Sequence, residues 1–329
     1  MLRYRITYGL LFTTLLLGVF YLDVRLAGNW PNLPWAAPPG SIVALAAVLL
    51  IPLALREMQG LLKRQNVTIS MRICVVASLL CMTWPWISQI ASETSRTEET
   101  LATRRATEPA ATAWTQVAQR FETVKPHYLV PTVMAVSLVG AFVMHTRHHR
   151  IEGAMANAGG TLLAIVYLGL LPGFFLPICL THGAWMVLGI VAIVKMADVG
   201  AYTTGRLIGR HKLIVWLSPG KTVEGFLGGL VAAGVTGMLV MALHRSSVTL
   251  PPGSVIYSMT AALVTGAILG VVLGAVGQLG DLMESLLKRD AGVKDSGHVP
   301  GFGGVLDLLD SPLLAAPAAY WMLKLLGRS

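Results

Sequence analysis

Long apolar runs recur along the chain, separated by shorter segments that carry most of the polar residues. Nine runs come close to the roughly 20 residues that an α-helix needs to cross the hydrocarbon core of a bilayer. They span residues 8–27, 39–55, 73–91, 128–145, 160–180, 183–197, 225–243, 255–277 and 312–327. The sixth and ninth runs are the shortest. The pattern predicts an all-α fold, a polytopic transmembrane helix bundle with about nine spans and a range of eight to ten.

The composition agrees with this membrane assignment. Of 329 residues, 54% are hydrophobic and 12% are charged, whereas an ordinary soluble domain has about 25% charged residues. The cysteines Cys74, Cys81 and Cys179 all fall in apolar runs without zinc-ligand spacing, so we expect them to be small core residues. The first run follows Arg3 and Arg5 as in a signal peptide. Its length and the lack of a clear small-residue cleavage site favour an uncleaved helix.

The net charge of +9 would suggest a nucleic-acid partner in a soluble protein. Here most cations lie in short segments beside apolar runs, which fits membrane topology and anionic ligands, so we expect no nucleic-acid partner. With the N-terminus in the cytoplasm, nine alternating spans place 16 of the 25 lysines and arginines on the cytoplasmic side. The polar segment 92–127 is then an external loop.

We therefore predict a multi-pass protein of the cell (inner) membrane. Residues 1–158 form N-terminal transmembrane helices, and residues 159–329 form a C-terminal region with two cytoplasmic motif loops.

The first motif loop is a glycine-broken segment at 198–225. Its Gly-Lys-Thr triplet at 220–222 resembles the end of a phosphate-binding P-loop, but that motif needs a glycine at the position where Val215 stands. The P-loop interpretation therefore fails. The segment still concentrates cations suited to binding phosphates, which are Arg206, Arg210, Lys212 and Lys221.

The second motif loop, at 280–311, combines carboxylates, cations and glycine turns. Four of its polar residues share one face of a helix, with spacing i, i+3, i+4 and i+7. They are Asp281, Glu284, Ser285 and Lys288. Asp307 and Asp310 stand where the ninth helix begins, and the glycines between the two sets predict a turn that folds them together. A solvated loop explains any one of these residues, but carboxylates at the ends of apolar helices are costly and usually functional.

The second loop closely resembles the signature of phosphatidate cytidylyltransferases, also called CDP-diacylglycerol synthases. The matching residues are Ser285, Lys288, Arg289, Lys294, Asp295, Pro300, Gly301, Gly303, Gly304, Asp307 and Asp310. The first loop is similar to an upstream segment of the same family. Its matches are Asp198, Ala201, Tyr202, Gly205, Arg206, Gly209, Ser218, Pro219, Lys221, Thr222, Glu224 and Gly225. The resemblance covers residues 160–329, while the earlier residues match only as apolar spans.

The sequence departs from the family pattern at four points. Phe302 stands where the family usually has His, and Leu308 stands where it usually has Arg. The stretch between Asp295 and Pro300 is one residue shorter than usual, and Gly220 replaces a Lys or Asn. The missing His and Arg put phosphate contacts in doubt, and they leave open a divergent substrate or an inactive paralogue.

The resemblance implies that CTP and phosphatidate react to give CDP-diacylglycerol and pyrophosphate in phospholipid biosynthesis. The nucleophile is then a lipid phosphate oxygen that is already anionic at neutral pH, so no general base is needed. Catalysis rests on positioning and charge neutralisation. Mg²⁺ takes hard oxygen ligands, usually one or two carboxylates with phosphates and waters. The resemblance implies Asp281 and Asp307 as its ligands, with a second cation left open.

The other candidate residues follow from the same resemblance. The implied catalytic residues are Asp281, Asp307, Lys288, Lys294 and Asp295. The implied substrate-binding residues are Ser285, Arg289, Asp198, Tyr202, Arg206, Ser218, Lys221, Glu284 and Asp310. Asp310 and Asp198 are the second choices as metal ligands. The implied partners are CTP, phosphatidate and the lipid bilayer, and a homodimer is left open.

Two other kinds of protein stay in view. A transporter also contains broken helices and charges within the membrane, but here the charges cluster at one face and no two halves of the chain repeat. A related membrane nucleotidyltransferase or lipid kinase with another lipid acceptor would share the motifs. CTP-dependent product formation separates the three.

Overall fold

A computed structural model of the chain describes residues 2–28, 37–104, 126–147, 151–247, 258–297 and 304–326. These residues are almost wholly helical. The helices are α1 (Leu2–Ala27), α2 (Ser41–Arg64), α3 (Met71–Arg104), α5 (Pro126–Thr146), α6 (Ala154–Ile165), α7 (Leu171–Gly173), α8 (Phe175–His182), α9 (Ala184–Ile208), α10 (Val223–Ser247), α11 (Met259–Asp290) and α12 (Val305–Leu326). A π-helical turn, η1 (Val166–Leu170), joins α6 to α7. Two short antiparallel strands, β1 (Lys212–Ile214) and β2 (Ser218–Thr222), form a hairpin between α9 and α10.

Every predicted apolar run overlaps a helix or a continuous series of helices, which confirms the all-α membrane bundle. Within the described ranges, seven helical segments are long and apolar enough to cross a membrane. They are Ser41–Arg64, Met71–Ser92, Tyr128–Thr146, Ala154–His182, Ala184–Ile208, Val223–Arg245 and Met259–Asp290. The sixth predicted run is among them, because its helix extends beyond the run, whereas α1 and α12 are not. The cytoplasmic position of the N-terminus stays a prediction.

The predicted loop at 198–225 is wrong in its first half, because residues up to Ile208 continue α9. The glycines that suggested a break instead let α9 approach the segment that follows it. A Cβ on Gly200 would lie 2.5 Å from the Cβ of Ala232 in α10, and one on Gly205 would lie 2.9 Å from Thr222 Oγ1. Only the stretch after α9 leaves the helix, and it forms the β1–β2 hairpin.

The predicted external loop at 92–127 also begins later than expected, because α3 continues to Arg104. Residues 93–104 include glutamates, Leu101 and Ala102, all of which favour helix. Residues 105–125 lie outside the described part of the chain. The side of the membrane on which this segment lies stays a prediction.

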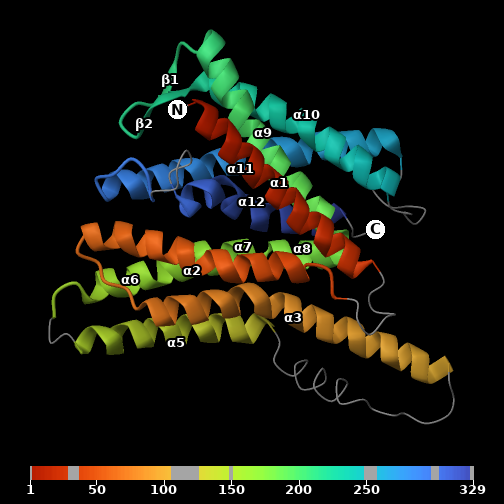
Figure 1. The fold of residues 1–329 in the computed structure, drawn as a ribbon, viewed down its shortest axis with the longest axis horizontal. Coiled ribbons are helices and arrows are strands. Elements are labelled where there is room, and N and C mark those ends of the chain that lie inside the picture. The colour runs from red at the N-terminus through yellow and green to blue at the C-terminus, as the bar shows by residue number, and fades with distance from the viewer. Residues whose placement is uncertain are drawn as a thin grey trace.

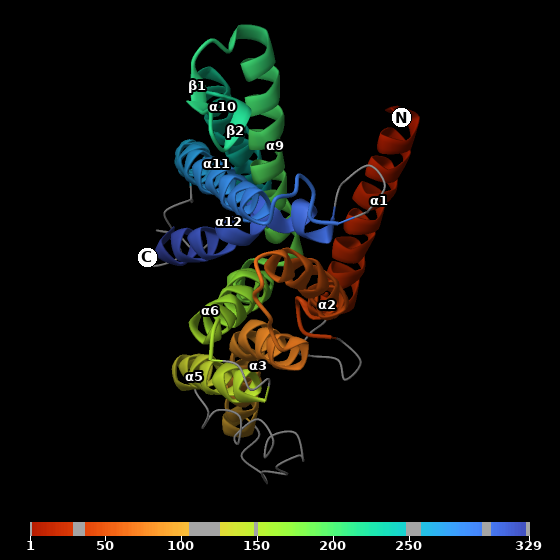
Figure 2. The ribbon, with the colours of Figure 1, turned by 90° about the vertical axis from the view of Figure 1, so that its left-hand side faces the viewer.

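Two groups of helices meet at α12. The helices α9, α10 and α11 pack against one another, with the hairpin at one end (Figure 1). Figure 2 shows α12 between this group and a second group made of α2, α3, α5 and α6, and α12 contacts α2, α9 and α11. The end of α11 and the start of α12 therefore lie close to α2 and α9, although these segments are far apart in the sequence.

Small residues bring α10 and α11 into close contact. A Cβ on Gly270 of α11 would collide with the carbonyl oxygen of Ala233 in α10, and one on Gly274 would lie 2.6 Å from the Cβ of Ala233. Membrane helices associate through such close packing, since lipid tails are as apolar as their side chains. The approach of the two backbones fixes α10, which follows the hairpin, against α11, which carries the acidic residues.

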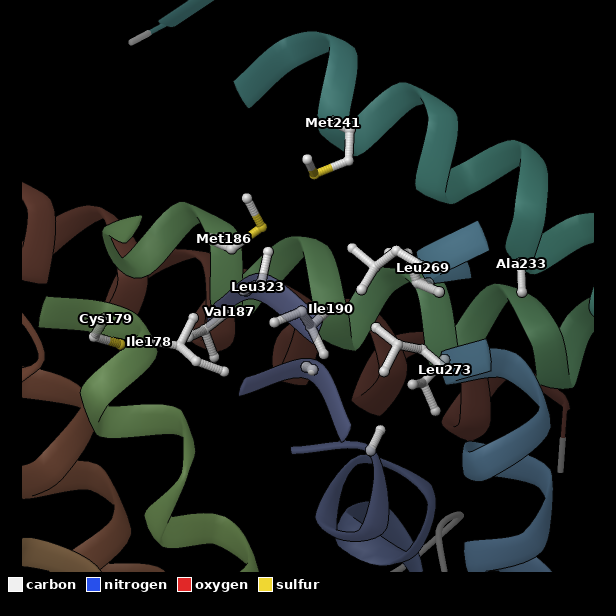
Figure 3. Close-up of a cluster of buried hydrophobic side chains, with 14 of the residues drawn as sticks. Ile178, Cys179, Met186, Val187, Ile190, Ala233, Met241, Leu269, Leu273 and Leu323 are labelled. Carbon is white, nitrogen blue, oxygen red and sulfur yellow. The ribbon is translucent and has the colours of Figure 1, made fainter. Parts of the chain in front are cut away.

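A buried apolar cluster lies among α8, α9, α10, α11 and α12 (Figure 3). Ile190 of α9 and Leu269 and Leu273 of α11 are among its fully buried members. In a bilayer this cluster contributes mainly van der Waals packing. It sets the relative positions of α9, α11 and α12, and so the positions of the polar residues at their ends.

Candidate active site

A cleft of about 410 Å³ lies where α9 ends and α10 begins, between these helices, the hairpin and α11. Its volume falls within the range of about 300–1,000 Å³ that is usual for small-molecule sites. The lining residues are Asp198, Ala201, Tyr202, Gly205, Arg206, Leu213, Ser218, Gly220, Lys221, Thr222, Gly225, Phe226, Gln278 and Asp281. Both predicted motif segments therefore contribute to one cavity.

The hairpin is held against α10 by Glu224, in the first turn of that helix. The Glu224 carboxylate accepts hydrogen bonds from the backbone N–H groups of Arg210, at 3.1 Å, and His211, at 3.2 Å. Its Oε1 also lies 2.6 Å from Nδ1 of His211. The carbonyl oxygen of His211 accepts a bond from the Val223 N–H at 2.9 Å. These contacts fix the hairpin that carries Ser218 and Lys221.

An ion pair crosses the cleft from the hairpin to α11. Lys221 Nζ lies 2.7 Å from Asp281 Oδ2, and the two side chains are 24% and 32% exposed. Apart from this ion pair, the buried Lys221 ammonium has no hydrogen-bond partner among the described residues. An ammonium has three donors, so Lys221 has donors left for a ligand in the cleft.

Three carboxylates gather behind the cleft. One oxygen atom from each of Asp281, Glu284 and Asp310 lies within 4.8 Å of the others. Asp281 and Glu284 lie one helical turn apart in α11, and Asp310 lies in α12. Glu284 and Asp310 are buried. Hard oxygen donors at this separation have the chemistry that Mg²⁺ requires.

Several polar atoms around these carboxylates lack partners. Apart from the ion pair of Glu284 with Lys288, the two Glu284 oxygens have no hydrogen-bond partner in the described part of the chain. The hydroxyl of Tyr167 in η1 is also without one, although Tyr167 is only 2% exposed. Unpaired buried polar groups are costly. Their presence beside a carboxylate group fits a site that a cation completes.

Lys288 joins the acidic group to Asp307. Its Nζ lies 2.8 Å from Glu284 Oε2 and donates a hydrogen bond to Asp307 Oδ1 at 2.6 Å. Asp307 Oδ2 also accepts bonds from Ser296, at 2.9 Å from the hydroxyl and 3.2 Å from the backbone N–H. Asp307 is thus fixed by three donors.

Lys195 provides a third cation at the acidic group. Its Nζ lies 3.6 Å from Asp198 Oδ2 and 3.6 Å from Asp310 Oδ1. Ammonium groups from three different elements therefore surround the carboxylates, namely those of Lys195, Lys221 and Lys288. A pocket with alternating charges of this kind can hold a metal ion and the phosphates of a substrate together.

The structure unites many of the predicted site residues and leaves others apart. Six line the cleft, namely Asp198, Tyr202, Arg206, Ser218, Lys221 and Asp281. Four more belong to the adjoining network, namely Glu284, Lys288, Asp307 and Asp310. Arg289, Lys294 and Asp295 are exposed, Ser285 is half-buried, and none of these four lines the cleft. Their predicted roles stay predictions.

Residues 298–303, with the predicted turn and Phe302, lie outside the described part of the chain. The predicted metal pair Asp281 and Asp307 also stays a prediction. In the structure Asp281 is grouped with Asp310, while Asp307 is bonded to Lys288.

Sequence reasoning missed four residues of the network. Lys195, Tyr167, Ser296 and Glu57 were not proposed as site residues, although each lies in or beside the network. The signal for two of them was present. Lys195 is a charged residue within an apolar run, and Glu57 is an acidic residue close to the end of another.

Comparison with known proteins shows similarity to cytidylyltransferases. The family profile described as "Cytidylyltransferase family" matches residues 35–326. The chain is 39% identical over 163 residues to a phosphatidate cytidylyltransferase of Staphylococcus saprophyticus, covering 49% of this chain and 57% of that protein. It is 38% identical over 172 residues to that of Bacillus subtilis, covering 51% and 59%. It is 33% identical over 201 residues to that of Staphylococcus aureus, covering 58% and 71%. The chain thus spans a little over half the length of the first two of these relatives.

Proposed function

Because this chain belongs to the cytidylyltransferase family, we propose that it is a phosphatidate cytidylyltransferase. It converts CTP and phosphatidate to CDP-diacylglycerol and pyrophosphate. A phosphate oxygen of phosphatidate attacks the α-phosphorus of CTP and forms a new P–O bond. The bond from the α-phosphorus to the oxygen that bridges to the β-phosphate breaks, and pyrophosphate leaves. The observation that supports this proposal most is the cleft in which Lys221 meets Asp281 beside the carboxylate group.

The cleft suits the triphosphate of CTP. Lys221 and Arg206 line it, and both can donate to phosphate oxygens. Arg206 also donates to the Tyr202 hydroxyl at 2.9 Å, which orients the guanidinium along the wall of the cleft. Ser218 and the open backbone around Gly220 add room and donors for the nucleotide. Binding here places the α-phosphate close to Asp281.

The carboxylate group fits Mg²⁺ by the nature and spacing of its oxygens, and by the buried Glu284, whose one pairing among the described residues by distance is the ion pair with Lys288. In our proposal Asp281 is the first ligand of the ion, and Asp307 is the second, as predicted from the motif. The neighbouring carboxylates of Asp310 and Glu284 can share the ion. Bound there, Mg²⁺ neutralises charge on the phosphates.

The residues of the chain supply the rest of the chemistry. Both reacting groups are anions, so the main barrier to their approach is electrostatic. Lys221, Lys288 and Lys195 lie around the site from different elements and lower that barrier. The attacking phosphate is already ionised, so no side chain has to remove a proton from it. Lys195 also brings a cation to Asp310.

We extend the proposal to the topology. Both motif segments face the cytoplasm, where CTP is available, and the protein lies in the inner membrane of a bacterial cell. Single cysteines at Lys212 and Lys294 should react with a membrane-impermeant maleimide only after the cells are opened, while a control cysteine within 92–127 should react in intact cells. Labelling of both motif positions in intact cells would overturn this topology. A homodimer is left as a prediction.

The test of the function is an acceptor panel. The purified protein is incubated with CTP, Mg²⁺ and mixed micelles that contain phosphatidate, diacylglycerol or an isoprenoid phosphate, and lipid products and pyrophosphate are measured. We expect a CDP-lipid and an equal amount of pyrophosphate with phosphatidate alone. A CDP-lipid only with the isoprenoid phosphate would assign a related nucleotidyltransferase, and phosphatidate made from diacylglycerol would assign a lipid kinase. No product with any acceptor would support an inactive paralogue.

A further inference from the structure

Glu57 of α2 lies against the start of α12, far from the two motif segments in sequence. Its Oε1 accepts the backbone N–H of Val305 at 2.9 Å, and its Oε2 accepts that of Leu306 at 2.9 Å. The first N–H groups of a helix have no partner within the helix and need one from elsewhere. The residue before α12 is Gly304, which has no side chain to act as a cap. A carboxylate from another helix therefore caps α12.

The same carboxylate is connected to Asp307. The hydroxyl of Ser296 lies 3.2 Å from Glu57 Oε2 and 2.9 Å from Asp307 Oδ2, so it can donate to either. Asp307 lies in the first turn of α12, the turn that Glu57 caps. Glu57 is thus connected to Asp307 through the backbone of α12 and through Ser296.

The local packing is built around Glu57. A Cβ on Gly297 would lie 2.6 Å from Glu57 Oε1, and one on Gly304 would collide with Glu57 Oε2. Glycine at both positions therefore lets the chain close around the carboxylate. Glu57 itself lies within a candidate membrane span, between the exposed Arg56 and the fully buried Met58. An acidic residue in such a helix is costly, and this cost is usually associated with a function.

We propose that Glu57 is a positioning residue for the transfer reaction, which places Asp307 by capping α12 and binding Ser296. This inference rests on the proposed function. Glu57 does not line the cleft. Its loss should therefore reduce turnover and the response to Mg²⁺ more than it changes the KM for CTP. A displacement of about 1 Å at a reacting group can cost on the order of a hundredfold in rate.

The chain offers a matched control in Asp23 of α1. Its carboxylate also caps a helix from a different helix, because it accepts the N–H groups of Gly40 and Ile42 at the start of α2, each at 2.8 Å. Asp23 is 2% exposed and lines no part of the cleft. Asp23→Asn therefore reports what the loss of such a cap does to the fold alone.

The experiment compares wild type, Glu57→Gln, Glu57→Asp and Asp23→Asn, purified in detergent, with CTP and phosphatidate over a range of Mg²⁺ concentrations. In Glu57→Gln we expect kcat to fall by about 10- to 100-fold and half-saturation by Mg²⁺ to move to higher concentration, with KM for CTP within about threefold. Glu57→Asp should recover part of the turnover. Asp23→Asn should melt at a lower temperature but keep kcat within about threefold.

Each outcome decides between explanations. An inactive wild type would refute the proposed function. If the wild type is active and Glu57→Gln keeps the wild-type kcat and Mg²⁺ response, only the role of Glu57 is refuted. The same conclusion follows if Asp23→Asn and Glu57→Gln lose turnover equally. If Glu57→Gln does not fold, Ser296→Ala keeps the cap of α12 and the bond from the Ser296 N–H to Asp307, but removes the hydroxyl that joins Glu57 to Asp307. It must then show a smaller shift of the Mg²⁺ response in the same direction, and wild-type behaviour in that variant would overturn the inference.

Discussion

The substitution Asp281→Asn separates a role in chemistry from a role in folding. It keeps the shape of the side chain but removes its charge, so Lys221 loses its partner at 2.7 Å and the carboxylate group loses one member. The ion pair is partly exposed, so its loss should cost only about 0–1 kcal/mol of folding free energy. The loss of a major electrostatic stabiliser in the reaction should cost at least about a hundredfold in kcat, which corresponds to about 2.7 kcal/mol. The effect on turnover should therefore exceed any effect on stability.

The assay for Asp281→Asn is the initial rate of CDP-lipid formation at saturating CTP, together with the melting temperature of the purified protein. Asp290→Asn is the control, since Asp290 lies on the same helix and is exposed away from the cleft. It should stay close to wild type in both measurements. Near-normal turnover of Asp281→Asn at low Mg²⁺ would remove the metal-site assignment. The charge cluster would then serve only to orient the chain in the membrane.

The two candidate partners of Asp281 can be distinguished in the same assay. If the motif prediction is right, Asp307→Asn lowers turnover as much as Asp281→Asn, and the double variant is hardly worse than either, because residues that act as a unit are not additive. If the metal site is instead the group of Asp281, Glu284 and Asp310, whose oxygens lie within 4.8 Å of one another, Asp310→Asn should lower turnover as much as Asp281→Asn. The double variant of these two residues should then be hardly worse than either. Additive losses for both pairs would contradict a shared ion.

Three further predictions follow from single contacts. Lys221→Met should raise the KM for CTP by at least about tenfold with little change in melting temperature, and an unchanged KM in initial-rate measurements would place CTP elsewhere. Gly270→Ala adds a Cβ that collides with the backbone of α10 and should lower stability by about 1–3 kcal/mol in thermal melts, whereas Gly159→Ala meets open space and should not. Lys195→Met leaves Asp310 without its nearby cation and should lower kcat about tenfold, so wild-type kinetics would exclude Lys195 from the reaction.

Hydrophobic patterning was enough to predict the membrane bundle. Apolar runs of spanning length have few alternatives, because in lipid the backbone must satisfy its hydrogen bonds within the helix. The same reasoning failed at 198–208, where Gly200 and Gly205 suggested a break. Those glycines allow close helix packing, and a single sequence does not distinguish the two uses of glycine.

The site was predicted in its components but not in its pairing. Motif spacing identified Asp281, Glu284 and Lys288 on one helical face, and the structure brings all three into one charged network. The partners from other helices could not be predicted. Lys195 and Glu57 reach the network only because α9 and α2 pack on either side of α12. Long-range packing of this kind leaves a weak trace in the sequence, here a charge inside one apolar run (Lys195) and a charge just past the end of another (Glu57).

The central claim is that the α-phosphate of CTP is transferred to phosphatidate, and position-specific labelling of CTP tests it most directly. The purified protein receives phosphatidate and Mg²⁺ with CTP labelled at either the α- or the γ-phosphate. The account predicts that the α-label appears in the lipid product and the γ-label in free pyrophosphate, and that both are lost when a chelator removes Mg²⁺. Transfer of the γ-label to lipid would identify a lipid kinase, and the absence of both labels from lipid would contradict the account.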